Sequence, residues 1–213
     1  MAFLLKLFGI DLEGEKKDKF RELETKWGSD PEILKHAKVG WLLSRGQEMV
    51  QKGYPNQAIR DSEEALQIDP ESIAAYQALM SEYIITKRFG DAAKTSTRCL
   101  DMIEKSGNEE VKMHKMHIYF MQGMIGLEMK DMEVVAQCFL LFLKQEKKAV
   151  TSPVWQKMVK ESNLVSEHIL LDDNGNSLEK EHLEYVRIAK ETLTELKSGL
   201  NPEAQKLISE VLS

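Results

Sequence analysis

A loop near the C-terminal end of the chain, Asp172–Ser177, is rich in carboxylate and amide side chains. Such oxygen ligands suit calcium when their spacing lets them act together. Asp172, Asn174 and Asn176 could be the first, third and fifth ligands, but the glycine that should follow them falls inside the run, at Gly175. We therefore predict an ordinary turn here and no calcium site, because adjacent Asn and Gly tolerate left-handed backbone conformations.

Sulfur and imidazole side chains are dense in the middle of the chain. Thioether and imidazole groups can capture copper. Methionine is also a flexible filler of apolar gaps and a common lining of adaptable peptide-binding surfaces. Because the stretch falls within a predicted helix, we favour packing or peptide contact over a metal site. The residues concerned are Met113, His114, Met116, His117, Met121, Met124 and Met129.

Catalysis needs converging nucleophiles, bases and oxyanion donors, and the sequence has no motif that assembles them. It lacks a Gly-rich phosphate loop, a nucleophile elbow and a paired-histidine metal motif, and its 5 histidines are scattered. Cys99 and Cys138 fall on apolar helical faces, so we expect reduced, packed thiols. We predict a non-enzyme without cofactor or metal, and an unrecognised enzyme is the least favoured alternative.

The composition predicts a folded protein of the all-α class. Apolar residues make up 42% and charged residues 30% of the chain, near globular averages, which argues against wholesale disorder. Only 5 Pro and 12 Gly occur, which permits long helices.

The formal net charge of -6 disfavours nucleic acid as a partner. A phosphate backbone requires clustered Lys and Arg, whereas the densest basic run, Lys144, Lys147 and Lys148, is interrupted by Glu146. No apolar stretch approaches the roughly 20 residues needed to span a bilayer, and the first ten residues lack the features of a signal peptide. We expect a cytoplasmic protein.

Residues 1–10 are unusually apolar for a chain terminus. They could contact a membrane surface as a short helix, or they could cover an end of the helical array or join two copies in a homo-oligomer. We favour the second interpretation, because interfacial anchors usually carry more cationic residues than the single Lys6 present here.

Small residues and a proline recur at fixed spacing within residues 39–72. Gly46, Ala58, Ala65 and Pro70 occupy the eighth, twentieth, twenty-seventh and thirty-second positions of this window. The segment resembles a tetratricopeptide repeat, a pair of antiparallel helices about 34 residues long. Small side chains let the two helices nest, and the proline ends the second helix.

Two more copies follow. Residues 73–106 match the repeat well, and residues 116–149 match it less well after an insertion around Gly107 that should lengthen the next helix back toward residue 109. The first copy departs from the family at Arg45, where leucine is common, and the third at Phe142, where a small residue is usual. The matching residues are Tyr76, Leu79, Tyr83, Phe89, Ala92 and Cys99 in the second copy, and Tyr119, Gly123, Met132, Val135 and Phe139 in the third.

These repeats predict an antiparallel helix-hairpin array, an α-solenoid of the tetratricopeptide type with capping helices. We predict a helical extension in residues 1–38, the repeat domain in residues 39–149 and capping or extension helices in residues 150–213. The flanks contain helix-start patterns at Asp30-Pro31, Ser152-Pro153 and Asn201-Pro202, and an apolar helical face follows Leu178.

The resemblance implies a scaffold or adaptor that binds a protein or peptide in a concave groove formed by the first helix of each repeat. Some family members clamp an acidic chaperone tail with Lys, Arg and Asn at their contact positions. Those residue types do not occur at the corresponding positions of this chain, so an apolar helix or extended segment is the implied ligand. Phe120, Met121 and Met124 would anchor it. The family's contact positions correspond to Leu43, Gln47, Gln51, Gln77, Ser81, Ile84, His117, Phe120, Met121, Met124 and Leu127.

The main alternative is a self-assembling structural protein whose groove is filled by its own terminal helices. Three repeats are near the minimum for a stable array, so cap helices are expected. The sequence leaves both functions open.

Overall fold

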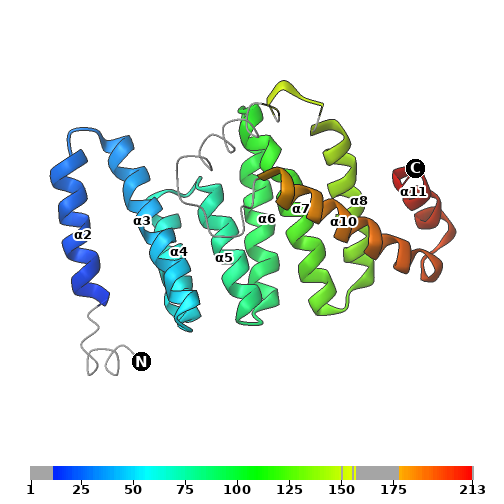
Figure 1. The fold of residues 1–213 in the computed structure, drawn as a ribbon, viewed down its shortest axis with the longest axis horizontal. Helices are drawn as coiled ribbons and strands as arrows, with labels where there is room; N and C mark the ends of the chain where they lie inside the picture. Colours follow the sequence, from blue (N-terminus) through cyan, green and yellow to red (C-terminus); the bar gives the residue numbers. More distant parts are fainter. Residues whose placement is uncertain (1–11, 150, 155, 157–177, 213) are drawn as a thin grey trace. The chain divides into compact units, whose positions relative to one another are not determined.

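A computed structural model describes residues 12–149, 151–154, 156 and 178–212, and every regular element in this part of the chain is a helix (Figure 1). Consecutive helices pack against each other in an array, which confirms the predicted all-α class. The helices are α2 (Leu12–Trp27), α3 (Pro31–Gln51), α4 (Pro55–Ile68), α5 (Ile73–Ile85), α6 (Phe89–Lys105), α7 (Glu109–Met129), α8 (Met132–Ala149), α10 (Leu178–Leu196), the short 3-10 helix η1 (Lys197–Gly199) and α11 (Pro202–Leu212).

Several helices begin at side chains that cap them. Asp30 Oδ1 accepts hydrogen bonds from the backbone N–H groups of Glu32 and Ile33, at 3.2 and 3.1 Å, and proline follows it as the first residue of α3. Ser72 and Asn201 cap α5 and α11 in the same way. These bonds satisfy N–H groups that have no partner inside the helix, and they confirm the predicted starts of α3 and α11.

The turns after α3, α5 and α7 share one backbone feature. Gly53, Lys87 and Lys130 have positive φ angles of 82°, 59° and 57°. Each stands at the fifteenth position of its predicted repeat. After α3 and α7 the following residue also donates to a carbonyl five positions earlier, as Tyr54 does to Met49 at 2.7 Å. This bond belongs to a common motif that ends helices.

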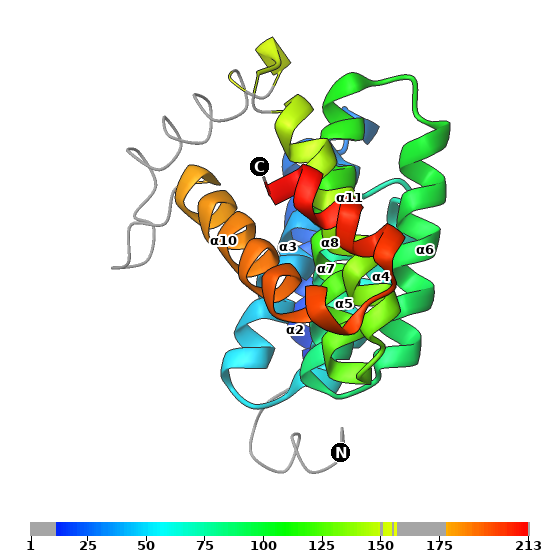
Figure 2. The same ribbon diagram turned by 90° about the vertical axis from the view of Figure 1, so that its right-hand side faces the viewer.

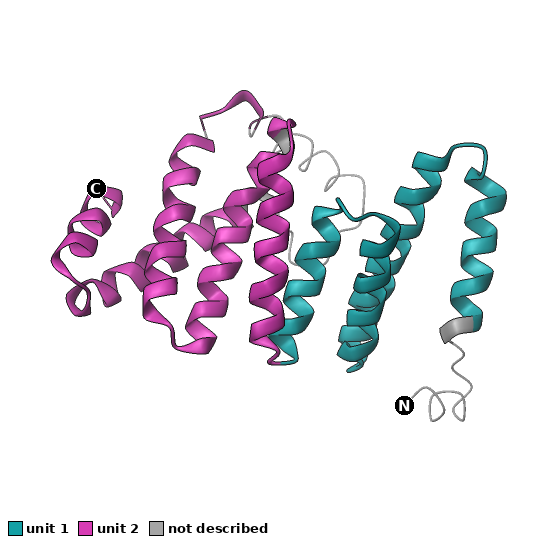
Figure 3. Ribbon diagram, turned by 180° about the vertical axis from the view of Figure 1, so that it is seen from behind, with its two compact units in different colours: residues 1–86 teal, residues 87–213 magenta. Residues whose placement is uncertain are grey.

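The chain divides into two compact units, residues 1–86 and residues 87–213 (Figure 3). In the first unit, α2 packs on α3, α3 on α4 and α4 on α5. Val39, Leu42, Ala65 and Ala75 form a buried cluster there, with Phe20, Trp41, Leu43, Leu66 and Ile68 packed around it.

In the second unit, α6 packs on α7 and α7 on α8, while α10 and α11 both pack on α8 (Figure 2). Their shared core includes Phe139 and Phe142 from α8, Leu193 from α10 and Ile208 from α11. The two C-terminal helices therefore cover apolar side chains of the α7–α8 pair.

The structure confirms the start of α7 at Glu109 and the helices predicted after Leu178. The predicted turn at Asp172–Ser177 and residues 1–10 lie outside the described residues. Among the helices described, none is long and apolar enough to cross a membrane. The predicted boundaries at residues 38/39 and 149/150 stay predictions.

Candidate partner-binding faces

In the first unit, the predicted groove residues lie on α3 and α5. Leu43, Gln47 and Gln51 follow one another at intervals of four residues along α3, which places them on one side of that helix. Gln77, Ser81 and Ile84 follow one another at intervals of four and three residues, which also places them on one side of α5, and α3 contacts α5. Gln47, Gln51 and Ser81 are exposed, while the other three are half-buried. We call these six residues the α3–α5 face.

Glycine allows the helices behind this face to approach closely. A Cβ atom added at Gly46 of α3 would lie 3.6 Å from the Cα of Ala58 in α4 and 3.4 Å from Oε1 of Glu82 in α5. The sequence predicts that Gly46 and Ala58 let the two helices of the first hairpin nest. The close contact between Gly46 and Ala58 confirms this role.

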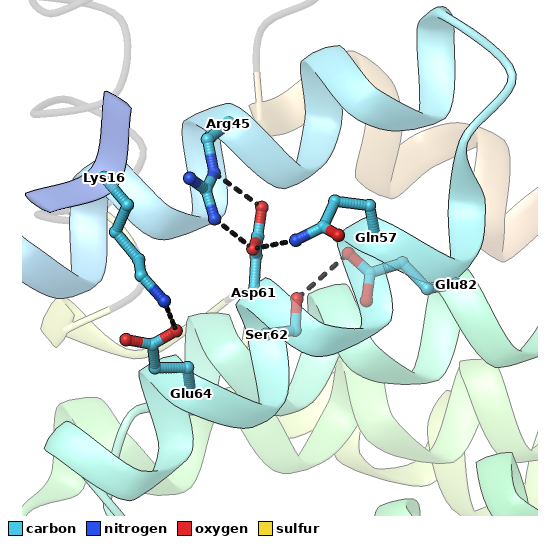
Figure 4. Close-up of polar contacts among 7 residues, drawn as sticks. All are labelled: Lys16, Arg45, Gln57, Asp61, Ser62, Glu64 and Glu82. Carbon is cyan, nitrogen blue, oxygen red and sulfur yellow. Dashed lines mark hydrogen bonds and ion pairs between the residues drawn. The ribbon is translucent and has the colours of Figure 1, made fainter. Parts of the chain in front are cut away.

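A buried ion pair joins α3 to α4. The guanidinium of Arg45 donates to both carboxylate oxygens of Asp61, at 2.8 and 2.5 Å, and Gln57 donates to the same carboxylate at 3.0 Å (Figure 4). Arg45 is 3% exposed and Asp61 1% exposed. The guanidinium also lies 4.6 Å from the centre of the Trp41 ring. Arg45 therefore joins the two helices of this pair.

A second buried carboxylate joins α5 to α4. Glu82 is 5% exposed, and its Oε1 accepts a hydrogen bond from the Ser62 hydroxyl at 2.9 Å (Figure 4). Its Oε2 is buried without a hydrogen-bond partner. Burial raises the pKa of Glu82 to about 7; the Ser62 bond opposes this shift, and the negative charges of Asp61 and Glu63 add to it. Glu82 thus carries less than a full charge near neutral pH.

In the second unit, the predicted groove residues of α7 lie in or beside the core. Phe120 is 5% exposed and Met121 8% exposed. Met124 and Leu127 are partly buried and pack against the core cluster. The expected anchors of a partner are thus engaged by residues of this chain.

Helix α10 contributes to that engagement through Tyr185. The Tyr185 ring stacks on the Phe120 ring with 4.2 Å between centroids and 21° between planes, and it also lies 5.3 Å from the His117 ring. Nearer the start of α10, His182 lies edge-on to Phe142, and its Nε2 is 3.5 Å from Oε1 of Glu146. We call His117, Phe120, Phe142 and Glu146 the α10-binding face.

The two thiols are packed inside the second unit. Cys99 is fully buried on α6 and Cys138 is buried on α8, and both are free. Burial raises the pKa of Cys99 to about 12 and that of Cys138 to about 11. Such thiols form little thiolate at neutral pH and are therefore poor nucleophiles.

Most of the methionine-rich stretch packs as apolar filler, whereas Met129 at the end of α7 is 51% exposed. Met116 and Met121 are buried, and Met113 and Met124 are partly buried against the core. Burial also lowers the pKa of His114. Among the described residues, His, Cys, Asp and Glu form no group of three that could hold a metal ion.

A cleft of about 270 Å³ opens between one end of α6, the start of α7 and the end of α8. Two ion pairs stand on its rim, Lys115 with Glu104 and Lys112 with Glu109. The remaining lining residues are Met113, Met116, Gln145, Lys148 and Ala149. Serine, cysteine and histidine are absent from the lining of this cleft.

Comparisons with protein-family models, curated proteins and solved structures find no match to this chain.

Sequence reasoning missed Tyr185 as a site residue. The apolar spacing of Val186, Ala189 and Leu193 predicted a buried face on α10, but not which helix would cover it. The burial of Phe120 could not be predicted either, since an aromatic residue suits a groove and a core equally well.

Proposed function

We propose that the chain is a non-catalytic protein-interaction scaffold of the tetratricopeptide type, which binds an apolar helix or extended segment of a partner. The observation that carries the proposal is in the second unit, where two of the α7 positions assigned to ligand contact, His117 and Phe120, lie against an amphipathic helix, α10. A surface that already holds one such helix has the shape and chemistry needed for that class of ligand.

The repeat assignment is supported by the turns. Positive φ angles recur at the same position of all three predicted repeats, although only one of the three residues is a glycine. Lysine adopts this conformation reluctantly. A backbone requirement at the same position of each predicted repeat explains the recurrence better than the local sequence does.

The α3–α5 face is the part of the proposed surface that a partner reaches directly. Its exposed residues are the polar Gln47, Gln51 and Ser81, with the half-buried Leu43 and Ile84 among them. Ile85, beside Ile84, is 53% exposed. This mixture suits a segment that inserts a few apolar side chains and forms hydrogen bonds through its backbone.

Site-specific photocrosslinking tests the proposal. A photoreactive residue at Gln47 and, separately, at Ser81 should trap the same partner. The control carries the photoreactive residue at Gln67, an exposed position on α4. Crosslinks of equal strength from Gln67 would contradict binding through the α3–α5 face.

A self-assembling structural protein is the second candidate function, and the Tyr185–Phe120 stack favours it. In that case the α7 positions serve the chain's own C-terminal helices and hold no foreign ligand. The same experiment separates the two, because the product trapped from Gln47 and Ser81 would then be a second copy of this chain.

A further inference from the structure

Helix α10 is amphipathic and turns its apolar side to α7 and α8. Ala189 and Leu193 are fully buried, His182 is buried, and Tyr185 is half-buried against Phe120. The opposite side of α10 is charged and exposed, and there Arg187 pairs with acidic residues on either side of it. Such a helix has the form of a ligand for an apolar groove.

The contacts that hold α10 are of a kind that another helix could supply. On the α10-binding face, the Tyr185 ring stacks on Phe120, and His182 lies next to Phe142 and Glu146. Ala189 and Leu193 complete the buried side of α10. An aromatic residue, a small residue four positions later and a leucine four positions after that would meet the same requirements.

We infer that the α10-binding face recognises an amphipathic helix, that α10 is its resident ligand, and that a partner helix with the same apolar spacing binds there by displacing α10. This inference rests on the proposed scaffold function, and it names the regulation of that function. The predicted anchor Phe120 becomes available to the partner when α10 leaves.

Tethering sets how strong the partner must be. A covalently attached helix competes at an effective concentration of about 1 mM. A partner present at about 1 μM must therefore bind roughly 1,000-fold more tightly than α10 does without its tether.

Charge at one end of the face provides a way to gain that affinity. Oε1 of Glu146 lies 3.5 Å from Nε2 of His182, and the Glu146 side chain is 18% exposed. A partner helix with Arg at the corresponding position would place a permanent cation against this carboxylate and form a charge-assisted hydrogen bond.

A synthetic peptide of residues 178–212, labelled with a fluorophore, tests displacement by fluorescence anisotropy. The full-length Ala189→Glu variant releases its own α10, because a carboxylate at this fully buried position cannot be solvated. The matched control is Thr194→Glu, which adds the same charge at an exposed position of α10. We expect the Ala189→Glu variant to bind the peptide at least about 100-fold more tightly than the wild-type chain or the control. Equal binding by all three proteins would overturn the inference.

Hydrogen exchange of the wild-type chain gives a second reading that needs no substitution. We expect the amides of α10 to exchange at least about 100-fold faster than those of α8, because α10 leaves while the α7–α8 pair stays folded. Equal protection would mean that α10 leaves only when α8 unfolds, and it would overturn the inference even if the Ala189→Glu variant does not fold.

The scaffold function and the displacement of α10 can fail separately. A partner trapped from Gln47 and Ser81, together with equal peptide binding by all three proteins, would support the scaffold function and overturn displacement. Tight peptide binding by the Ala189→Glu variant, with no partner trapped on the α3–α5 face, would support displacement and count against the scaffold function.

Discussion

At the scale of single residues, the first unit contains two buried carboxylates in different electrostatic settings. Asp61 receives a two-point hydrogen bond from the Arg45 guanidinium, which compensates for the loss of water around both charges. Glu82 has one neutral donor, the Ser62 hydroxyl, and two nearby carboxylates. Asp61 therefore has a cationic partner on another helix, whereas burial without such a partner raises the pKa of Glu82.

We predict that the first unit loses stability as pH rises between about 4.5 and 7. The folded state binds a proton at Glu82 with a pKa of about 7, whereas a glutamate in the unfolded chain has its ordinary pKa of about 4.5. Stability from this proton is complete below pH 4.5 and lost as pH rises through 7, with a total change of at most about 3 kcal/mol. Glu82→Gln should remove this dependence, as measured by the protection factors of α4 and α5 amides at a series of pH values.

Glu63→Gln is the matched control for the pH series. Glu63 is exposed and accepts a hydrogen bond from the Tyr83 hydroxyl at 2.9 Å. This variant should keep most of the pH dependence, because the buried Glu82 is still present. Parallel profiles for the wild-type chain and Glu82→Gln would show that Glu82 is not the titrating group.

At the scale of secondary-structure elements, close packing of α7 on α8 depends on Gly123. A Cβ atom at this position would overlap the ring of Phe139, which is fully buried. We predict that Gly123→Ala destabilises the second unit by about 1–3 kcal/mol, because a packed ring must leave its rotamer or the helices must separate. Hydrogen exchange of α8 amides measures the loss.

Gly40→Ala tests whether the effect comes from packing. Gly40 lies inside α3 with open space around the position of a Cβ. Alanine there should stabilise the first unit by about 0.5–1 kcal/mol, because it restricts the unfolded chain and favours helix. A stabilising effect of Gly123→Ala as well would refute the close contact with Phe139.

The order and bounds of the elements could largely be predicted from sequence, because caps, prolines and apolar spacing are local properties. Asp30, Ser72 and Asn201 show this, since each starts a helix through its own side chain. Local patterns do not say which apolar face meets which, so Tyr185 on Phe120 was not predicted. The role of Arg45 depended on a carboxylate one helix away, and its departure from the repeat pattern was the sequence feature that could have revealed the pair.

At the scale of the whole molecule, the distribution of charge limits the class of partner. The net charge of -6 and the ion pairs along α2, α3 and α10 leave a surface of mixed sign. Exposed pairs of this kind contribute little to stability. These ion pairs do keep the exposed sides of their helices hydrated. An apolar segment of a partner is therefore expected to bind on helix sides without such pairs.

The division into two units predicts how substitutions combine. Glu82→Gln acts through contacts of Glu82 inside residues 1–86, and Gly123→Ala acts through Phe139 inside residues 87–213. Substitutions that share no partner add to within about 0.5 kcal/mol. In the double variant, exchange protection of α5 at pH 8 should therefore change as in Glu82→Gln alone, and that of α8 as in Gly123→Ala alone. A change in α5 protection caused by Gly123→Ala would show that the units open together, because local opening of one unit leaves the amides of the other protected.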